Sequence, residues 1–136
     1  MSDVLNLAPF SNAIGRLDEG LARYLSDTRD TQIRDGLVLR FEFTYELAHK
    51  TLKRFLEGVS PTPGEYDSTD FQYLIRSASE QGLLLHDWPA WKRYRDMRAK
   101  TSHTYDETVA LEVVGGIGHF LEEARYLCEQ ISKRLV

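Results

Sequence analysis

Apolar side chains recur every three or four residues along most of this chain, and this spacing narrows the possible folds more than any other feature. The spacing places apolar residues on one side of an α-helix, and no segment shows the period of two that is typical of strands. It predicts helices over about 9–25, 31–57, 69–81, 87–100 and 106–134. Long helices with short connections favour an all-α fold, an antiparallel up-and-down bundle of four to five helices.

Residues that stop or cap helices separate these segments. Gly58–Ser68 is rich in proline and glycine and is the one clear loop, and Gly82 suits the end of the third helix. Pro89 suits the first turn of the fourth, where a missing N–H has no effect. Thr104 and Glu107 have the spacing of a capping box, which predicts that Thr104 caps the last helix and Glu107 reaches back to it.

The second predicted helix is apolar over more of its circumference than one buried face requires. This excess predicts a second interface and offers a surface for a homodimer. The additional apolar residues are Val38, Leu39, Phe43, Tyr45 and Leu56.

Length and composition are those of one ordinary globular domain spanning 1–136, since 42% of the 136 residues are hydrophobic and 28% are charged. Cys128 is the only cysteine and forms no intramolecular disulfide; no leader is recognisable near Met1, so we expect a cytoplasmic protein. No apolar run is long enough to cross a membrane. The net charge of −4 argues against non-specific coating of nucleic acid, so any contact with RNA must be local.

One arginine of the fourth predicted helix is expected to face inward. Arg98 lies roughly 40° from the centre of the inward stripe, whereas the other basic residues of this helix project about 100° or more away. The stripe consists of Trp91, Tyr94, Met97 and Thr101.

An inward guanidinium needs a partner, because burying an unpaired charge is costly. Two interpretations stay open. Arg98 is either a buried arginine satisfied by an acidic side chain, or a cation that receives a ligand anion. The candidate acidic partners are Glu42, Glu46 and Asp96.

His103 and Tyr105 flank the predicted start of the last helix, where free N–H groups and the helix dipole favour an anion. With Arg98 approaching from the preceding helix, they predict a phosphate-sized site. Residues 92–100 hold five basic residues against one acidic one, which indicates either phosphate or RNA binding or a solvated helix face. The candidate phosphate or RNA contacts are Arg95, Lys100, Ser102 and Thr104.

The same residues resemble a known family. Arg98, His103 and Tyr105 reproduce the R-x4-H-x-Y motif of HEPN domains, and residues 101–107 look like the nucleotidyltransferase substrate-binding, HepT-like subgroup. Residues 40–48 resemble the second helix of that subgroup. The resemblance therefore extends from the second helix to the last.

This resemblance implies a dimerising helical bundle, often encoded beside a minimal nucleotidyltransferase (MNT). In such HEPN/MNT toxin–antitoxin pairs the HEPN chain is a metal-independent endoribonuclease, and the MNT partner silences it by transferring AMP to the motif tyrosine. By position, Arg98 and His103 would be catalytic and Tyr105 modified. No cofactor of its own is expected, since the partner would use the ATP. RNA cleavage needs both an acid and a base, and each chain has only one His103. A dimer would supply the second group as the other chain's His103.

Two positions depart from the family pattern. Ala99 follows the motif arginine, where active HEPN nucleases commonly have a polar residue, and His49 occupies a position that is commonly Trp in the subgroup. Ala99 favours an alternative in which the chain is a non-catalytic nucleotide- or substrate-binding subunit of a two-component nucleotidyltransferase.

The remaining features are interpreted as structural. His49 and His119 show no metal-ligand spacing, and His86 is expected to be a turn residue before the fourth helix. Residues 115–118, Gly-Gly-Ile-Gly, lack the strand and the Lys-Ser/Thr of a phosphate loop, so a kink or a close helix contact is expected there. Cys128 lies on the apolar flank of its helix and is expected to pack inertly.

Overall fold

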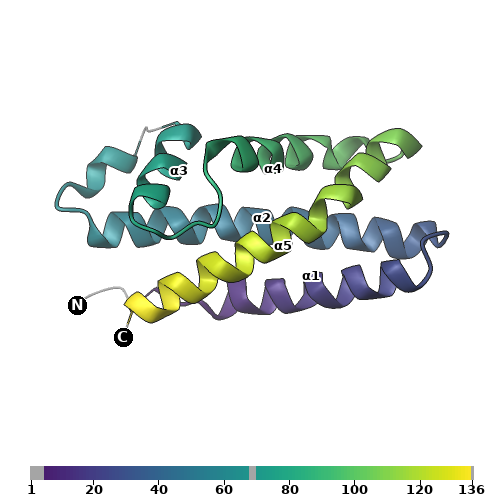
Figure 1. Ribbon diagram of the computed structural model, residues 1–136, viewed down its shortest axis with the longest axis horizontal. Helices are drawn as coiled ribbons and strands as arrows, with labels where there is room; N and C mark the ends of the chain where they lie inside the picture. Colours follow the sequence, from purple (N-terminus) through teal and green to yellow (C-terminus); the bar gives the residue numbers. More distant parts are fainter. Residues whose placement is uncertain (1–4, 68–69, 136) are drawn as a thin grey trace.

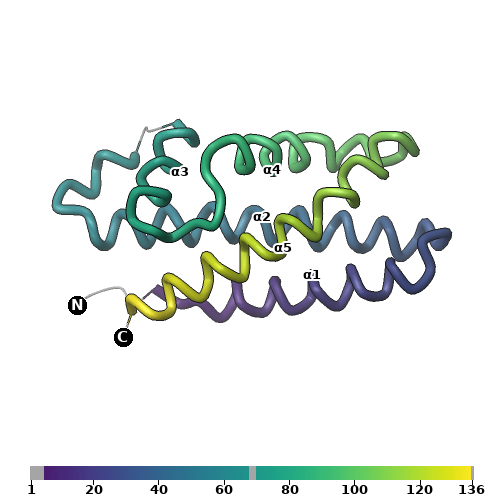
Figure 2. The backbone as a smooth tube through the Cα atoms, viewed as in Figure 1, coloured from purple at the N-terminus to yellow at the C-terminus, as the bar shows by residue number. Residues whose placement is uncertain are grey.

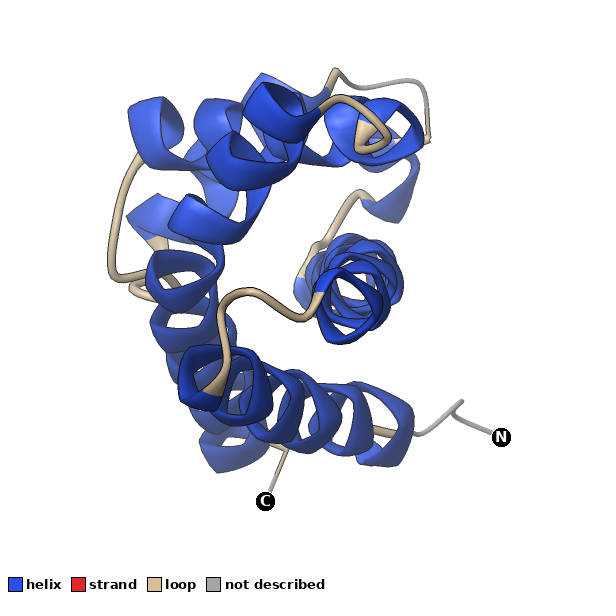
Figure 3. Ribbon diagram, turned by 90° about the vertical axis from the view of Figure 1, so that its right-hand side faces the viewer, coloured by secondary structure: helices blue, strands red, loops and turns tan. Residues whose placement is uncertain are grey.

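The computed structural model describes residues 5–67 and 70–135, and every regular element in that part of the chain is helical (Figures 1 and 3). No described residue lies in a strand, which confirms the predicted all-α class. The elements are α1 (Ala8–Ser26), α2 (Thr31–Val59), the 3-10 helix η1 (Pro63–Tyr66), α3 (Phe71–Glu80), α4 (Trp88–Lys100), the 3-10 helix η2 (Thr101–His103) and α5 (Glu107–Arg134).

Helix α2 is the longest element, and the other four α-helices all pack against it. α1 and α4 run in one direction along the molecule, whereas α2 and α5 run in the opposite one (Figure 1). α5 crosses the bundle obliquely, so that its last turns lie beside the first turns of α1 (Figure 2). None of the described helices has a stretch both long enough and apolar enough to cross a membrane.

Four of the five α-helices begin after an aspartate whose carboxylate accepts a backbone N–H of the first turn. Gly82 follows α3 with a φ of +73°, a left-handed conformation that favours glycine, so its predicted role at the helix end is confirmed. The predicted first residue of this helix, Thr69, lies outside the described residues. The capping aspartates are Asp30, Asp70, Asp87 and Asp106.

The predicted capping box at the start of α5 is wrong. Asp106 is the cap, and its Oδ1 accepts the N–H groups of Thr108 (2.9 Å) and Val109 (3.3 Å). The hydroxyl of Thr104 instead donates to the carbonyl of Thr101 at 3.2 Å. Threonine and aspartate both cap helices well. Asp106 directly precedes the first residue of α5, whereas Thr104 lies two residues earlier.

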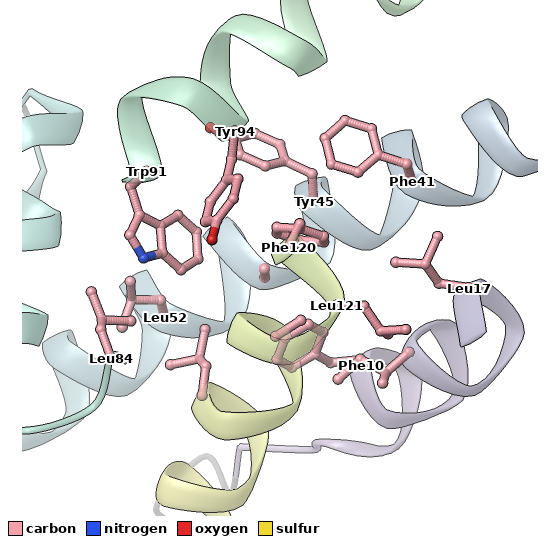
Figure 4. Packing of buried hydrophobic residues seen from close by; sticks show 14 of the residues in the cluster. Phe10, Leu17, Phe41, Tyr45, Leu52, Leu84, Trp91, Tyr94, Phe120 and Leu121 are labelled. Carbon is pink, nitrogen blue, oxygen red and sulfur yellow. The ribbon is translucent and has the colours of Figure 1, made fainter. Parts of the chain in front are cut away.

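The core is built around aromatic rings from three helices (Figure 4). Phe120 of α5 meets Phe41 of α2 edge to face at 5.1 Å and Tyr94 of α4 at 5.2 Å. Trp91 packs on Tyr94 at 5.3 Å, and Tyr45 completes the group. Buried Trp91, Tyr94, Met97 and Thr101 confirm the predicted inward stripe of α4.

The additional apolar residues of α2 are mostly buried within the chain. Val38, Tyr45 and Leu56 lie in the core because α2 packs against more than one helix, so the predicted second interface exists within the chain and these three residues offer no free surface for a homodimer. Phe43 is partly buried, and Leu39 is 58% exposed. The outer surface that remains is therefore small and centred on Leu39.

Two leucines that continue the apolar period of α1 and α5 are exposed. Leu25 is 64% exposed in the last turn of α1, and Leu135 follows the end of α5. Both stand at helix ends. The apolar spacing continues there, but no neighbouring helix packs over these side chains.

Candidate functional site

The three motif residues lie where α4 ends and α5 begins. Arg98 belongs to the last turn of α4, His103 ends η2, and Tyr105 directly precedes the cap residue of α5. The motif therefore spans the break between α4 and α5, where side chains can face solvent. The side chain of Arg98 is 33% exposed, and His103 and Tyr105 are more exposed still.

Arg98 is held by two carboxylates of α2. Its Nε donates to Oε1 of Glu46 at 2.7 Å, and its Nη2 lies 3.6 Å from Oε2 of Glu42. Its Nη1 donates to Oγ1 of Thr101 at 3.3 Å. Two of the three predicted acidic partners are thus confirmed, whereas Asp96 makes no ion pair with Arg98. A guanidinium has five N–H donors, and two of them are used in these hydrogen bonds, so three remain, including both on Nη2.

Thr101 fixes the turn that follows α4. Its buried side chain donates from Oγ1 to the carbonyl of Arg98 at 2.8 Å while it accepts from the Arg98 guanidinium. Its own carbonyl accepts the hydroxyl of Thr104. These bonds tie the position of the guanidinium to the backbone of η2, which ends in His103.

His103 and Tyr105 lie side by side at the surface. Their ring centroids are 6.1 Å apart with the planes at 68°, an edge-to-face arrangement. Tyr105 is 86% exposed, which leaves its hydroxyl accessible to another protein. His103 is exposed as well.

Carboxylates occupy the start of α5, so the predicted anion site at this helix terminus is wrong. Asp106 accepts two of the free N–H groups, and Glu107 accepts a hydrogen bond from Arg34 at 2.8 Å. This bond to the buried Arg34 guanidinium lowers the pKa of the Glu107 carboxyl. The only cation of the motif placed to meet a phosphate is therefore Arg98.

The predicted phosphate contacts differ in whether their side chains are already engaged within the fold. The ammonium of Lys100 is paired with Glu112 at 2.8 Å, and this hydrogen bond raises the pKa of Lys100. The guanidinium of Arg95 lies over the ring of Trp88, 5.1 Å from its centroid, and Ser102 is exposed. Thr104 is partly buried and its hydroxyl is used within the turn. Arg95 and Ser102 remain available.

A second polar cluster, which the sequence analysis did not predict, surrounds Glu123 of α5. Its buried carboxylate accepts the backbone N–H groups of Leu85 (2.7 Å) and His86 (2.9 Å) and the indole N–H of Trp91 (3.2 Å). Burial raises the pKa of Glu123. The signal was in the sequence, since Glu123 stands three residues after Phe120 on the inward stripe of its helix.

Two histidines distant in sequence meet beside this cluster. The rings of His86 and His119 are 4.6 Å apart between centroids, and the hydroxyl of Tyr94 is hydrogen-bonded to Nδ1 of His119. Among the described residues, no group of three or more histidines, cysteines, aspartates or glutamates is arranged to hold a metal ion.

Comparison with known proteins places this geometry in context. Residues 5–133 match the family model described as nucleotidyltransferase substrate binding protein like. The chain is 34% identical to the Haemophilus influenzae protein named "Probable ribonuclease HepT", over 98% of this chain and 97% of that relative.

A solved structure is similar over nearly the same extent. It is a protein of Haemophilus influenzae described as revealing the fold of a substrate-binding domain of a nucleotidyltransferase, and it superposes with a TM-score of 0.87 at 32% identity. The match covers 93% of this chain and 99% of the other.

Proposed function

This chain belongs to the nucleotidyltransferase substrate-binding protein-like family, and on that premise we propose that it is the HEPN ribonuclease toxin of a toxin–antitoxin pair. It cleaves RNA without metal through Arg98 and His103, and a partner minimal nucleotidyltransferase silences it by transferring AMP to Tyr105. The observation that carries the proposal is the Arg98 guanidinium, oriented by Glu46 and Glu42 with N–H groups left for a phosphate, at the same helix break as the exposed His103.

The proposed cleavage uses the ribose 2′-hydroxyl as nucleophile. His103 takes the 2′ proton, the 2′ oxygen bonds to phosphorus, and the bond from phosphorus to the 5′ oxygen breaks. An acid protonates the leaving 5′ oxygen, and Arg98 stabilises the charge on the phosphorane.

A second copy of the chain would supply that acid as its own His103. Exposed Leu39 and partly buried Phe43 lie on the same face of α2 as Glu42 and Glu46, at spacings of three and four residues. This apolar surface next to the partners of Arg98 supports a homodimer at the site.

The nuclease proposal is tested with purified protein and labelled RNA in the presence of a chelator. We expect cleavage by the wild type and a loss of about 10²- to 10⁴-fold in His103→Ala, the usual contribution of general acid–base catalysis. His86→Ala is the matched control, because it removes an exposed histidine outside the motif. Equal activity of the wild type and His103→Ala would show that the histidine is not catalytic.

The regulatory proposal is tested by intact mass after incubation with the partner and ATP. The Tyr105 oxygen would attack the α-phosphorus of ATP, pyrophosphate would leave, and the phenolic proton would pass to a base of the partner. We expect one or more AMP adducts on the wild type and none on Tyr105→Phe. Tyr73→Phe, also at an exposed tyrosine, should be modified like the wild type. An undiminished adduct on Tyr105→Phe would refute the assignment.

A second candidate function is a non-catalytic subunit that binds nucleotide or substrate for the partner transferase. Ala99 favours it, since no polar side chain follows Arg98 to orient a scissile phosphate, and the guanidinium is already balanced by two carboxylates. If this alternative holds, the wild type leaves RNA intact while its addition raises the rate of transfer by the partner.

A further inference from the structure

We propose that Arg34 of α2 is a positioning residue for the motif, which fixes the start of α5 and thereby the places of His103 and Tyr105; this inference rests on the proposed ribonuclease function. The Arg34 side chain is only 7% exposed, and its Nη1 donates to Oε1 of Glu107 at 2.8 Å. Glu107 is the first residue of α5 and stands two positions after Tyr105. The partner of this buried cation therefore adjoins the motif.

The stability of the fold does not account for a buried cation at this position. Glu107 is the only described carboxylate that forms an ion pair with Arg34, and its own side chain is 67% exposed. The Nε of Arg34 has no hydrogen-bond partner, and it is the one such buried side-chain nitrogen or oxygen in the part of the chain that the structure describes. A buried guanidinium with an exposed partner and an unpaired donor gains little to offset its lost hydration. Local exceptions of this kind are expected at functional sites.

The bond from Arg34 to Glu107 is the long-range connection of the turn that carries the motif. Among the described hydrogen bonds of residues 101–109, it alone reaches a distant element, since the others join residues at most four positions apart. His103 and Tyr105 are exposed, so little packing holds them in place. Their positions therefore depend on how firmly the start of α5 is held.

α2 holds the motif at both of its ends. Two carboxylates of α2, those of Glu42 and Glu46, hold the Arg98 guanidinium at the end of α4. Arg34, on the same helix, holds Glu107 at the start of α5. With a helical rise of about 1.5 Å per residue, the two points of attachment lie roughly 12–18 Å apart along α2. Both sides of the break between α4 and α5 are thus fixed to one helix, which keeps the motif histidine in register with the motif arginine.

The test first compares the stability of two variants that break the same ion pair. Arg34→Met removes the buried charge and leaves Glu107 in solvent, so its urea midpoint should equal or exceed that of the wild type. Glu107→Ala leaves the buried guanidinium without its acceptor, so its urea midpoint should fall. A residue kept for stability would give the same loss in both variants.

The order of the motif is measured on the same variants by NMR. Both should release the start of α5, so we expect the amide protons of Val109 and Ala110, which are bonded to Asp106, to exchange about tenfold faster or more. The nuclear Overhauser effects between the rings of His103 and Tyr105, which lie 6.1 Å apart between centroids, should be lost.

Activity is measured with labelled RNA. Arg34→Met should lower kcat by about 10- to 100-fold, because a displacement of about 1 Å in a catalytic group has an effect of this size. KM should stay within about twofold of the wild type, since Arg98 keeps its own partners. Arg34→Lys retains the charge and a donor for Glu107, and the native bond uses only one N–H, so this variant should recover most of the lost kcat and of the ring contacts.

Arg125→Met is the matched control. It makes the same substitution in another ion pair between two helices, with Asp18 of α1 at 3.0 Å, but there both side chains are exposed and lie outside the motif. Surface pairs of this kind contribute little to stability, so the urea midpoint, the exchange rates and kcat should match those of the wild type.

The outcomes separate a positioning role from a structural one. A urea midpoint of Arg34→Met that falls as far as that of Glu107→Ala, or failure of Arg34→Met to fold, overturns the proposal. Unchanged exchange rates and unchanged kcat in Arg34→Met overturn it as well. If the wild type cuts no RNA, the nuclease proposal fails alone, and the exchange rates and ring contacts still decide whether Arg34 orders the motif.

Discussion

Gly116 explains the glycine-rich run of α5 at the level of single atoms. A Cβ placed at Gly116 would lie 2.6 Å from Sδ and 2.8 Å from Cε of Met97, whereas one at Gly115 would meet nothing within 4 Å. Of the two predicted explanations, a kink or a close helix contact, the contact therefore applies at Gly116. Gly115 has no such constraint.

This contrast predicts opposite effects of two neighbouring substitutions. Gly115→Ala should raise the free energy of unfolding by about 1 kcal/mol, the difference in helix propensity. Gly116→Ala gains the same propensity but must displace the buried Met97 side chain, which costs about 1–3 kcal/mol, so its net effect should be zero or destabilising. Urea unfolding measures both. Equal stabilisation by the two alanines would contradict the close contact.

His49 is expected to make stability depend on pH. Burial lowers the pKa of its imidazole from the ordinary 6.5, so the unfolded chain binds a proton more readily than the folded one. This residue's contribution is fully present above pH 6.5 and is lost as the pH falls through the folded pKa. The melting temperature of the wild type should therefore drop more between pH 7.5 and 5.5 than that of His49→Gln. Parallel declines would contradict this.

At the scale of the helices, the start of α5 shows how a cap is chosen. Two helix caps are possible from the sequence: a capping box of Thr104 and Glu107, or Asp106 by itself. The spacing of Thr104 and Glu107 favours the capping box. In the fold, Glu107 is bound to Arg34, which lies 73 residues earlier in the chain. The reciprocal bond of a capping box is thereby lost, and Asp106 becomes the cap.

Two substitutions distinguish these caps. Asp106→Ala removes the acceptor of two N–H groups and should lower the free energy of unfolding by about 1 kcal/mol. Thr104→Ala removes one 3.2 Å hydrogen bond within the turn and should cost less. Chemical denaturation of both variants provides the comparison; a larger cost for Thr104→Ala would restore the capping-box interpretation.

For the molecule as a whole, Glu123 connects α5 to α4 and to the segment before it, a contact that no local sequence pattern predicts. Its carboxylate binds the segment before α4 and the indole of Trp91, so it anchors the helix that presents Arg98 to the oblique helix α5. The Glu123 carboxylate is fully buried, and the three N–H donors share it as their acceptor.

Glu123→Ala is therefore expected to be among the most damaging single changes. Two backbone N–H groups and the indole N–H lose their acceptor, which should lower the free energy of unfolding by about 2–4 kcal/mol. Glu122→Ala, at the exposed neighbouring residue, should stay within about 0.5 kcal/mol of the wild type. Calorimetry or urea unfolding distinguishes them, and similar stability of the two variants would contradict a structural role for Glu123.

The sequence alone determined the helices, the inward stripe of α4 and the place of the motif, because helical period and helix-stopping residues depend on near neighbours. The tertiary structure decided which side chains meet. It selected Glu46 and Glu42 rather than Asp96 for Arg98, and it closed the start of α5 to anions. Such contacts join residues about 50 to 70 positions apart, as Arg98 with Glu46 and Arg34 with Glu107 do. Only helix packing brings them together, and no local spacing encodes it.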